Sequence, residues 1–220
     1  MTHTKFVLLG YCLFLSSIGF SQHDLRRVSI STLPEQIKLI KDISVAIRWT
    51  DSIGDHVVLT TQKIKRPSDD VFFRRGERGL PEKSTSDLFE EPQLPATYSF
   101  TIKNDSAELN WKVVGTIKAC AQGTEGDKLK GSFIVTDLNE DKIAEVWIIY
   151  KGICVDDETQ ANMRITLCQT NKRYTMSGTR SIKIEGETFK GFYQFDQAFK
   201  NAPTVFVAYA EKLWKRNELD

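Results

Sequence analysis

The chain has 220 residues, of which 40% are hydrophobic and 27% charged, and its 30 basic side chains nearly balance its 29 acidic ones. A protein that neutralises nucleic-acid phosphates needs an excess of basic residues, so this balance argues against a nucleic-acid partner. The length is sufficient for one sizeable hydrophobic core.

Residues 1–21 have the pattern of an export signal. Lys5 supplies a positive charge, and an apolar run covers residues 6–20. Gly19 and Ser21 place small residues at the −3 and −1 positions of a cleavage site. Because the apolar run is short for a membrane span, we expect a cleaved signal peptide.

Cleavage would leave residues 22–220 as a single exported domain in the periplasm, at the cell surface or outside the cell. The alternatives are an uncleaved anchor and a lipoprotein acylated at Cys12, although Cys12 follows the bulky Tyr11, where a lipoprotein signal needs a small residue. Cleavage removes Lys5 and no acidic residue, so the mature chain carries no net charge. No later segment is apolar enough to serve as a transmembrane segment.

The first part of the mature chain predicts a helical turn and a hairpin. We expect the turn at residues 35–40 and the hairpin strands at 43–49 and 56–61, with Gly54 free to take a positive φ between them. Residues 63–96, approximately, are rich in charge and proline and predict an exposed loop excursion. Its basic cluster is either a solvated loop or a patch for an anionic glycan.

From residue 97 onward the sequence is rich in short strand patterns. The extended segments are 98–102, 109–114, 116–120, 131–136, 146–150, 163–168, 173–176, 181–184 and 188–193. Residues 195–201 predict one helical turn, 204–210 form a strong apolar segment, and 211–218 predict a short terminal helix. Short strands joined by polar turns predict a mainly β protein, with antiparallel hairpins in a sandwich-like or partial propeller-like arrangement.

The acidic loop at residues 137–145 has the spacing of a calcium site. Oxygen-bearing side chains stand at positions 1, 3, 5 and 9, and a backbone carbonyl is available at position 7. Because a tight loop turns alternate residues inward, this spacing can gather hard oxygen ligands around one ion. The predicted ligands of a structural calcium ion are Asp137, Asn139, Asp141, Ile143 and Glu145.

Lys142 stands at position 6 of this loop, where such loops prefer glycine. A side chain at positive φ costs about 1 kcal/mol there. The Lys142 ammonium group would also lower the affinity of the loop for calcium or partly replace the ion. The alternative to a calcium site is an acidic, water-filled hairpin turn.

Three cysteines follow the signal, namely Cys120, Cys154 and Cys168. An exported chain meets oxidising conditions, so we expect one disulfide and one remaining thiol. Cys120–Cys154 is favoured because it would join the two flanks of the acidic-loop hairpin. Cys154–Cys168 is the alternative, although Cys168 has the pattern of a small apolar residue packed in a sheet.

Support for catalytic chemistry is thin. A zinc site or a Ser-His-Asp triad would rest on His56 alone, which we expect on a strand facing solvent. Carboxylates such as Asp156 and Asp157 lie in a polar turn, where solvation is the simpler interpretation. Tryptophans could instead form a sugar-stacking platform: Trp111 and Trp147 fit a core or sheet face, and Trp214 is the best surface candidate, with Trp49 also available.

Residues 136–147 resemble the calcium loop of FG-GAP and VCBS-type repeats, whose usual pattern is Asp-x-Asn/Asp-x-Asp-Gly-x-x-Asp. This chain departs from it at Lys142 and Glu145. One clear copy is present, so the resemblance covers one hairpin and does not establish a propeller.

A wider resemblance covers most of the mature chain. The motifs that carry it occur at residues 49–60, 136–150, 154, 174–178, 202–203 and 213–214. They look like a family of exported Bacteroidota proteins described as surface polysaccharide biosynthesis proteins, which implies an envelope role and no known catalytic residues. We therefore expect a non-catalytic envelope protein whose partners are polysaccharide or other envelope proteins. The alternatives are a glycan-binding module and a carbohydrate-active enzyme that uses a carboxylate pair.

Overall fold

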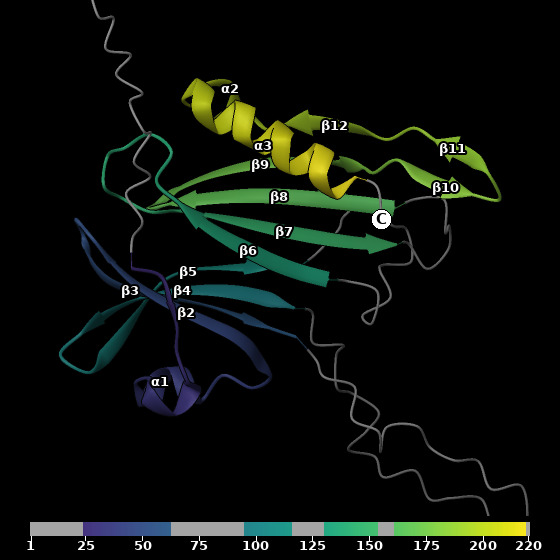
Figure 1. The fold of residues 1–220 in the computed structure, drawn as a ribbon. Coiled ribbons are helices and arrows are strands. Elements are labelled where there is room, and N and C mark those ends of the chain that lie inside the picture. Colours follow the sequence, from purple (N-terminus) through teal and green to yellow (C-terminus); the bar gives the residue numbers. More distant parts are fainter. Residues whose placement is uncertain (1–23, 63–94, 116–129, 154–160, 219–220) are drawn as a thin grey trace, which may run out of the picture.

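The computed structural model describes residues 24–62, 95–115, 130–153 and 161–218. They form two five-stranded antiparallel sheets that pack face to face, with helices on both outer faces (Figure 1). The predicted mainly β class is confirmed, and the arrangement is the sandwich-like one of the two expected.

The first sheet has the strand order β1-β2-β3-β4-β5. Its strands are β1 (Arg26–Arg27), β2 (Ile43–Asp51), β3 (Gly54–Thr61), β4 (Ala96–Lys103) and β5 (Ser106–Val114). The hairpin predicted between residues 43 and 61 is β2–β3. The tight turn between β4 and β5 places Asn104 at φ 47° and Asp105 at φ 62°, a conformation that short polar side chains tolerate. A short 3-10 turn, η1 (Ile30–Thr32), and α1 (Glu35–Lys38) lie at the start of this half.

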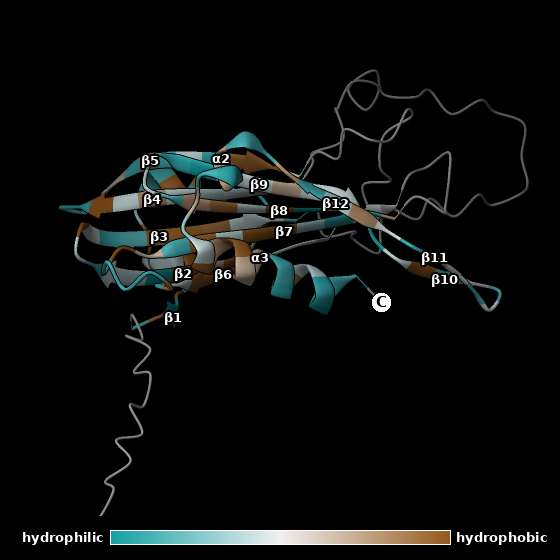
Figure 2. Ribbon diagram, turned by 90° about the horizontal axis from the view of Figure 1, so that it is seen from above, coloured by the Kyte–Doolittle hydropathy of each residue, from teal (hydrophilic) through white to brown (hydrophobic). Residues whose placement is uncertain are grey.

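The second sheet has the order β12-β9-β8-β7-β6. Its strands are β6 (Lys130–Thr136), β7 (Glu145–Ile153), β8 (Ala161–Gln169), β9 (Lys172–Thr179) and β12 (Phe192–Phe195). The extended segment expected at 188–193 is divided between β12 and a separate hairpin of β10 (Ile182–Ile184) and β11 (Glu187–Phe189). This hairpin extends beyond the sandwich in both views (Figures 1 and 2).

The C-terminal segment differs from the expectation. The apolar residues 204–210 and the expected short helix after them form one helix, α3 (Thr204–Asn217), which follows the helical turn α2 (Gln197–Lys200). The buried side chains of α3 are Phe206, Ala210, Leu213 and Trp214, which recur at helical spacing. A seven-residue apolar run resembles a buried strand, and the full helical period becomes visible only over fourteen residues.

The core consists of three layers of apolar side chains. The middle layer lies between the two sheets and includes Val58, Val113 and Ile148. One outer layer packs α1 against the first sheet, and the other packs α2 and α3 against the second sheet. This layering explains why strands such as β3 and β8 are buried on both faces.

Several sequence predictions concern residues outside the described ranges. They are the signal at 1–21, most of the excursion at 63–96, the segment at 116–120, Cys120, Cys154, Asp156 and Asp157. Among the described helices, none combines the length and the apolar character that crossing a bilayer requires.

Candidate functional site

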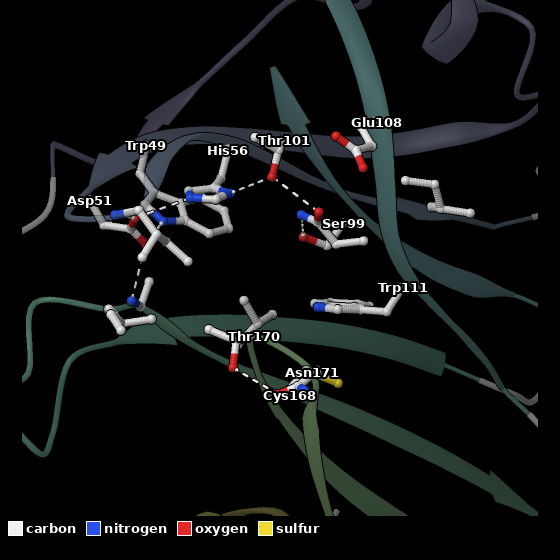
Figure 3. A pocket seen from close by; sticks show the side chains of 16 residues that line it. Trp49, Asp51, His56, Ser99, Thr101, Glu108, Trp111, Cys168, Thr170 and Asn171 are labelled. Carbon is white, nitrogen blue, oxygen red and sulfur yellow. Dashed lines mark hydrogen bonds and ion pairs between the residues drawn. The ribbon is translucent and has the colours of Figure 1, made fainter. Parts of the chain in front are cut away.

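A pocket of about 380 Å³ opens between the two sheets at one end of the sandwich (Figure 3). The first sheet contributes Trp49, Asp51, Ile53, His56, Ser99, Thr101, Glu108, Leu109, Asn110 and Trp111. The second sheet and its loops contribute Ile143, Ala144, Val146, Cys168, Thr170 and Asn171. The volume lies in the range of small-molecule sites, which span roughly 300–1,000 Å³.

The pocket has a buried interior and an exposed rim. Trp49, Ala144 and Val146 are buried, whereas Leu109 and Asn110 on β5 are exposed. Trp111 lies between these zones as a half-buried side chain on β5. One aromatic surface therefore remains accessible beside polar groups.

The other tryptophans do not offer such a surface. Trp214 was the best surface candidate, but it is 1% exposed, because it faces the second sheet and is covered by Tyr193 at 5.2 Å between ring centroids. Trp147 is completely buried under α3. The prediction that Trp214 is a surface residue is therefore wrong, and Trp111 takes that role.

Asp51 is a carboxylate at the end of β2 whose side chain is 2% exposed. One oxygen accepts hydrogen bonds from the Ile53 amide at 2.9 Å and from His56 Nε2 at 3.1 Å. The other accepts from Trp49 Nε1 and from the Ala144 amide, both at 3.2 Å. Burial alone would raise the pKa of Asp51, but the hydrogen bonds from His56, Ile53 and Ala144 outweigh burial and lower the pKa to about 2.

A chain of hydrogen bonds leads from Asp51 to the pocket rim (Figure 3). His56 Nδ1 lies 3.4 Å from the Thr101 hydroxyl, which donates to Asn110 Oδ1 at 3.0 Å. Asn110 Nδ2 in turn donates to the Ser99 hydroxyl at 3.3 Å. The chain connects β2, β3, β4 and β5 and orients the Asn110 amide.

The expectation that His56 faces solvent is wrong, because the side chain points into the space between the sheets and the residue is 5% exposed. A signal for this was present: residues 57–59 form an unbroken apolar run, which is typical of a central strand with both faces covered. On such a strand a histidine is buried whichever face it occupies.

The predicted calcium ligands are only partly brought together. Glu145 is fully buried at the start of β7, where its carboxylate accepts the Thr136 hydroxyl at 2.6 Å and the Leu138 amide at 2.9 Å. Burial raises the pKa of Glu145, against these hydrogen bonds. The carboxylate is thus held by groups of its own hairpin.

Asp141 lies on the exposed side of the loop. Its oxygens accept hydrogen bonds from the Ile143 amide and from Asn139 Nδ2, both at 2.8 Å, and from Gln169 Nε2 at 3.0 Å. Asp137 accepts the Lys142 amide at 3.2 Å. The Ile143 carbonyl, the expected position-7 ligand, accepts from Gln169 at 3.4 Å.

These carboxylates face protein donors and do not converge on a common point. Among the described residues, no group of three or more His, Cys, Asp and Glu side chains is placed to hold a metal ion. The observed donor set therefore does not fit a calcium ion without rearrangement of the loop. Calcium binding at residues 137–145 stays a prediction.

The loop is also part of the pocket wall. Its Lys142 carbonyl accepts the Ser52 amide at 3.0 Å, and its Ala144 amide donates to Asp51. The acidic loop thus joins the second sheet to the β2–β3 turn of the first. Sequence reasoning treated the loop and that turn as separate hairpins.

Cys168 is buried on β8 and is not in a disulfide. Burial raises the pKa of its thiol to about 11, so the thiol is protonated near neutral pH. It lines the pocket as a small apolar surface, as its sequence context indicated.

Among the described residues that line the pocket, Asp51 and Glu108 carry carboxylates. Asp51 already accepts four hydrogen bonds, whereas Glu108 is exposed and lies 3.5 Å from the Lys103 ammonium.

A scan of protein-family models, a search of curated proteins and a search of solved structures found no match to this chain. The site must therefore be interpreted from its own chemistry.

Proposed function

We propose that this chain is an exported, non-catalytic envelope protein that binds a glycan in the pocket between its sheets, in support of surface polysaccharide production or presentation. The observation that carries the proposal is Trp111, a half-buried indole that lines a pocket together with the polar side chains of Asn110 and Thr101. The envelope setting rests on the export signal and on the family resemblance of the sequence.

The pocket chemistry suits a sugar ring. A pyranose presents an apolar C–H face, which packs on an aromatic surface, and a rim of hydroxyl groups, which need hydrogen-bond partners. Trp111 supplies the aromatic surface, and Asn110, Asn171 and Thr170 stand at the exposed rim. Polar groups that converge beside apolar surface are the usual form of a small-ligand site.

A carbohydrate-active enzyme fits the same pocket less well. Glycoside hydrolysis in most families needs two carboxyl groups that act as acid, base or nucleophile. The Asp51 oxygens are fully engaged by donors, and the low pKa of Asp51 keeps it from acting as a proton donor near neutral pH. Glu108 alone does not make the required pair.

The test is glycan binding by the mature protein and two variants. Trp111→Ala removes the aromatic surface, and Phe189→Ala removes a 41% exposed aromatic side chain on the β10–β11 hairpin, away from the pocket. We expect the wild type and Phe189→Ala to bind the same members of a glycan array. Trp111→Ala should bind about tenfold more weakly or not at all, since truncating an aromatic anchor of a binding site often costs more than about 1 kcal/mol.

Two results would contradict the proposal. One is a folded mature protein that binds no glycan on the array, and the other is equal binding by wild type and Trp111→Ala. Hydrolysis of a bound oligosaccharide, lost in Glu108→Gln, would favour the enzyme alternative instead. A deletion strain with unchanged surface polysaccharide would remove the envelope part of the proposal.

A further inference from the structure

We propose that the pocket selects an uncharged sugar unit and discriminates against acidic sugars such as uronic acids. This inference rests on the proposed glycan-binding function and specifies its ligand class. It follows from the charges around the pocket, from the direction of its hydrogen bonds and from the placement of its apolar surface.

The charge of the side chains that line the pocket is the first support for this selectivity. None of the described residues that line the pocket is Lys or Arg, whereas Asp51 and Glu108 are acidic. Asp51 is buried against His56, and Glu108 stands at the rim on β5. The nearest cation to Glu108 is the Lys103 ammonium at 3.5 Å, and both side chains are about 70% exposed, so solvent screens this pair. A ligand carboxylate would therefore enter beside two acidic side chains. The basic groups near it are His56, which is paired with Asp51, and the exposed Lys103 and Arg173, the latter bonded to the Cys168 thiol.

The hydrogen-bond directions give the same answer. An anionic sugar needs donors, and three of the donors at this site are used within the protein. The Thr101 hydroxyl donates to Asn110, the Asn110 amide donates to Ser99, and the Thr170 hydroxyl donates to the Gln169 carbonyl at 2.7 Å. The exposed Glu108 carboxylate remains able to accept hydrogen bonds from sugar hydroxyl groups.

The apolar surface completes the match. Trp111 faces the pocket from the first sheet, while Ile143, Val146 and Cys168 line it from the second. These apolar side chains favour a ring with no charged substituent, because a carboxylate placed against them would lose hydration without compensation.

The experiment uses an array of neutral and acidic oligosaccharides. Within the array, oligogalacturonate is compared with its methyl ester, because the two share the same ring and linkage and differ in charge. At low ionic strength we expect the bound members to be uncharged, and each acidic counterpart to bind at least about tenfold more weakly. Glu108→Gln, which also frees Lys103, should reduce the ratio of neutral-sugar affinity to acidic-sugar affinity to about threefold or less. Glu187→Gln, the same exchange on the projecting hairpin, should leave it unchanged.

The outcomes separate the two proposals. Equal or tighter binding of acidic sugars, with Trp111→Ala still impaired, would overturn the charge selectivity and leave glycan binding standing. No binding of any sugar by the folded protein would overturn both. If Glu108→Gln and Glu187→Gln change the ratio of neutral-sugar to acidic-sugar affinity equally, Glu108 has no specific role in the selectivity.

Discussion

Asp51 organises the pocket end of the molecule. Its four hydrogen-bond donors come from β2, the following turn, β3 and the acidic loop of the second sheet. A buried carboxylate is tolerated only when donors replace its lost hydration, and here they do more than replace it. The charge on Asp51 should therefore contribute to stability in a pH-dependent way.

The pH dependence has a definite sign. The pKa of Asp51 is about 2 in the folded protein and 3.8 ordinarily, so the unfolded chain takes up this proton first as the pH falls. The contribution of Asp51 is complete above about pH 4 and is lost as the pH falls toward 2, with a total of about 2 kcal/mol. Urea unfolding of the wild type and of Asp51→Asn at several pH values measures this contribution to the free energy of unfolding. A difference in unfolding free energy between the two proteins that stays constant from pH 6 to pH 2 would contradict it.

Asp51→Asn should also be costly at neutral pH. An amide cannot accept from all four donors, so we expect a loss of about 2 kcal/mol, at the level of a buried unsatisfied group. The matched control is Asp55→Asn, because Asp55 pairs with Arg48 at a half-exposed site on the same hairpin and should cost less than about 1 kcal/mol. Similar losses in both variants would show that Asp51 has no special role.

At the scale of elements, the acidic hairpin shows what the sequence can and cannot predict. The two strands, the loop between them and the strained position of Lys142 all follow from local pattern, and Lys142 has φ 64°. The inward turn of Glu145 does not, because it depends on β7 being covered on both faces. Nor can local pattern predict that the loop contacts Asp51, 93 residues earlier in the chain.

The same limit explains the misplaced residues. His56 and Trp214 were assigned to the surface from short segments, but β3 and α3 are covered by elements distant in sequence. The pocket likewise combines residues 49–56, 99–111, 143–146 and 168–171. Each segment was predicted as a strand or turn, but their convergence is a property of how the two sheets pack.

Lys142→Gly should stabilise the protein. Glycine takes a positive φ without the steric cost of a Cβ, which is about 1–2 kcal/mol, and its greater freedom in the unfolded chain offsets about 0.4–1 kcal/mol of this. The net gain should be about 0.5–1 kcal/mol. Lys142→Ala is the control, since it removes the charge and keeps the Cβ. If the alanine variant gains as much as the glycine variant, the charge and not the backbone conformation is responsible.

Calcium binding by the loop is tested separately. A native-state ligand must raise the melting temperature, so millimolar calcium should raise it relative to chelator if the predicted site forms. Lys142→Gly restores the preferred residue at position 6 and should enlarge the shift. Equal melting temperatures with calcium and with chelator, in wild type and in Lys142→Gly, would exclude the site and leave the loop closed by its own hydrogen bonds.

At the scale of the whole molecule, Tyr150 links the two sheets. Its hydroxyl group on β7 lies 2.9 Å from the Thr97 hydroxyl on β4 and donates to the Val113 carbonyl on β5 at 3.2 Å. The ring is closely packed as well, because a Cβ added at Gly131 would lie 2.7 Å from it. Burial raises the pKa of Tyr150 to about 12, so the hydroxyl stays protonated and remains a donor.

Tyr150→Phe should therefore weaken the association of the two sheets. It leaves the buried Val113 carbonyl and Thr97 hydroxyl with one partner fewer, which typically costs about 1–3 kcal/mol, or roughly 2–10 °C in melting temperature for a chain of this size. Tyr193→Phe removes a hydroxyl group that is bonded to Glu211 at the exposed surface, and should change stability by less than about 0.5 kcal/mol. Because the pocket lies between the same sheets, Tyr150→Phe should also weaken glycan binding at temperatures near its melting transition, while Tyr193→Phe should not. Equal stability of the two variants would mean that apolar packing alone, and not this polar contact, fixes how the sheets meet.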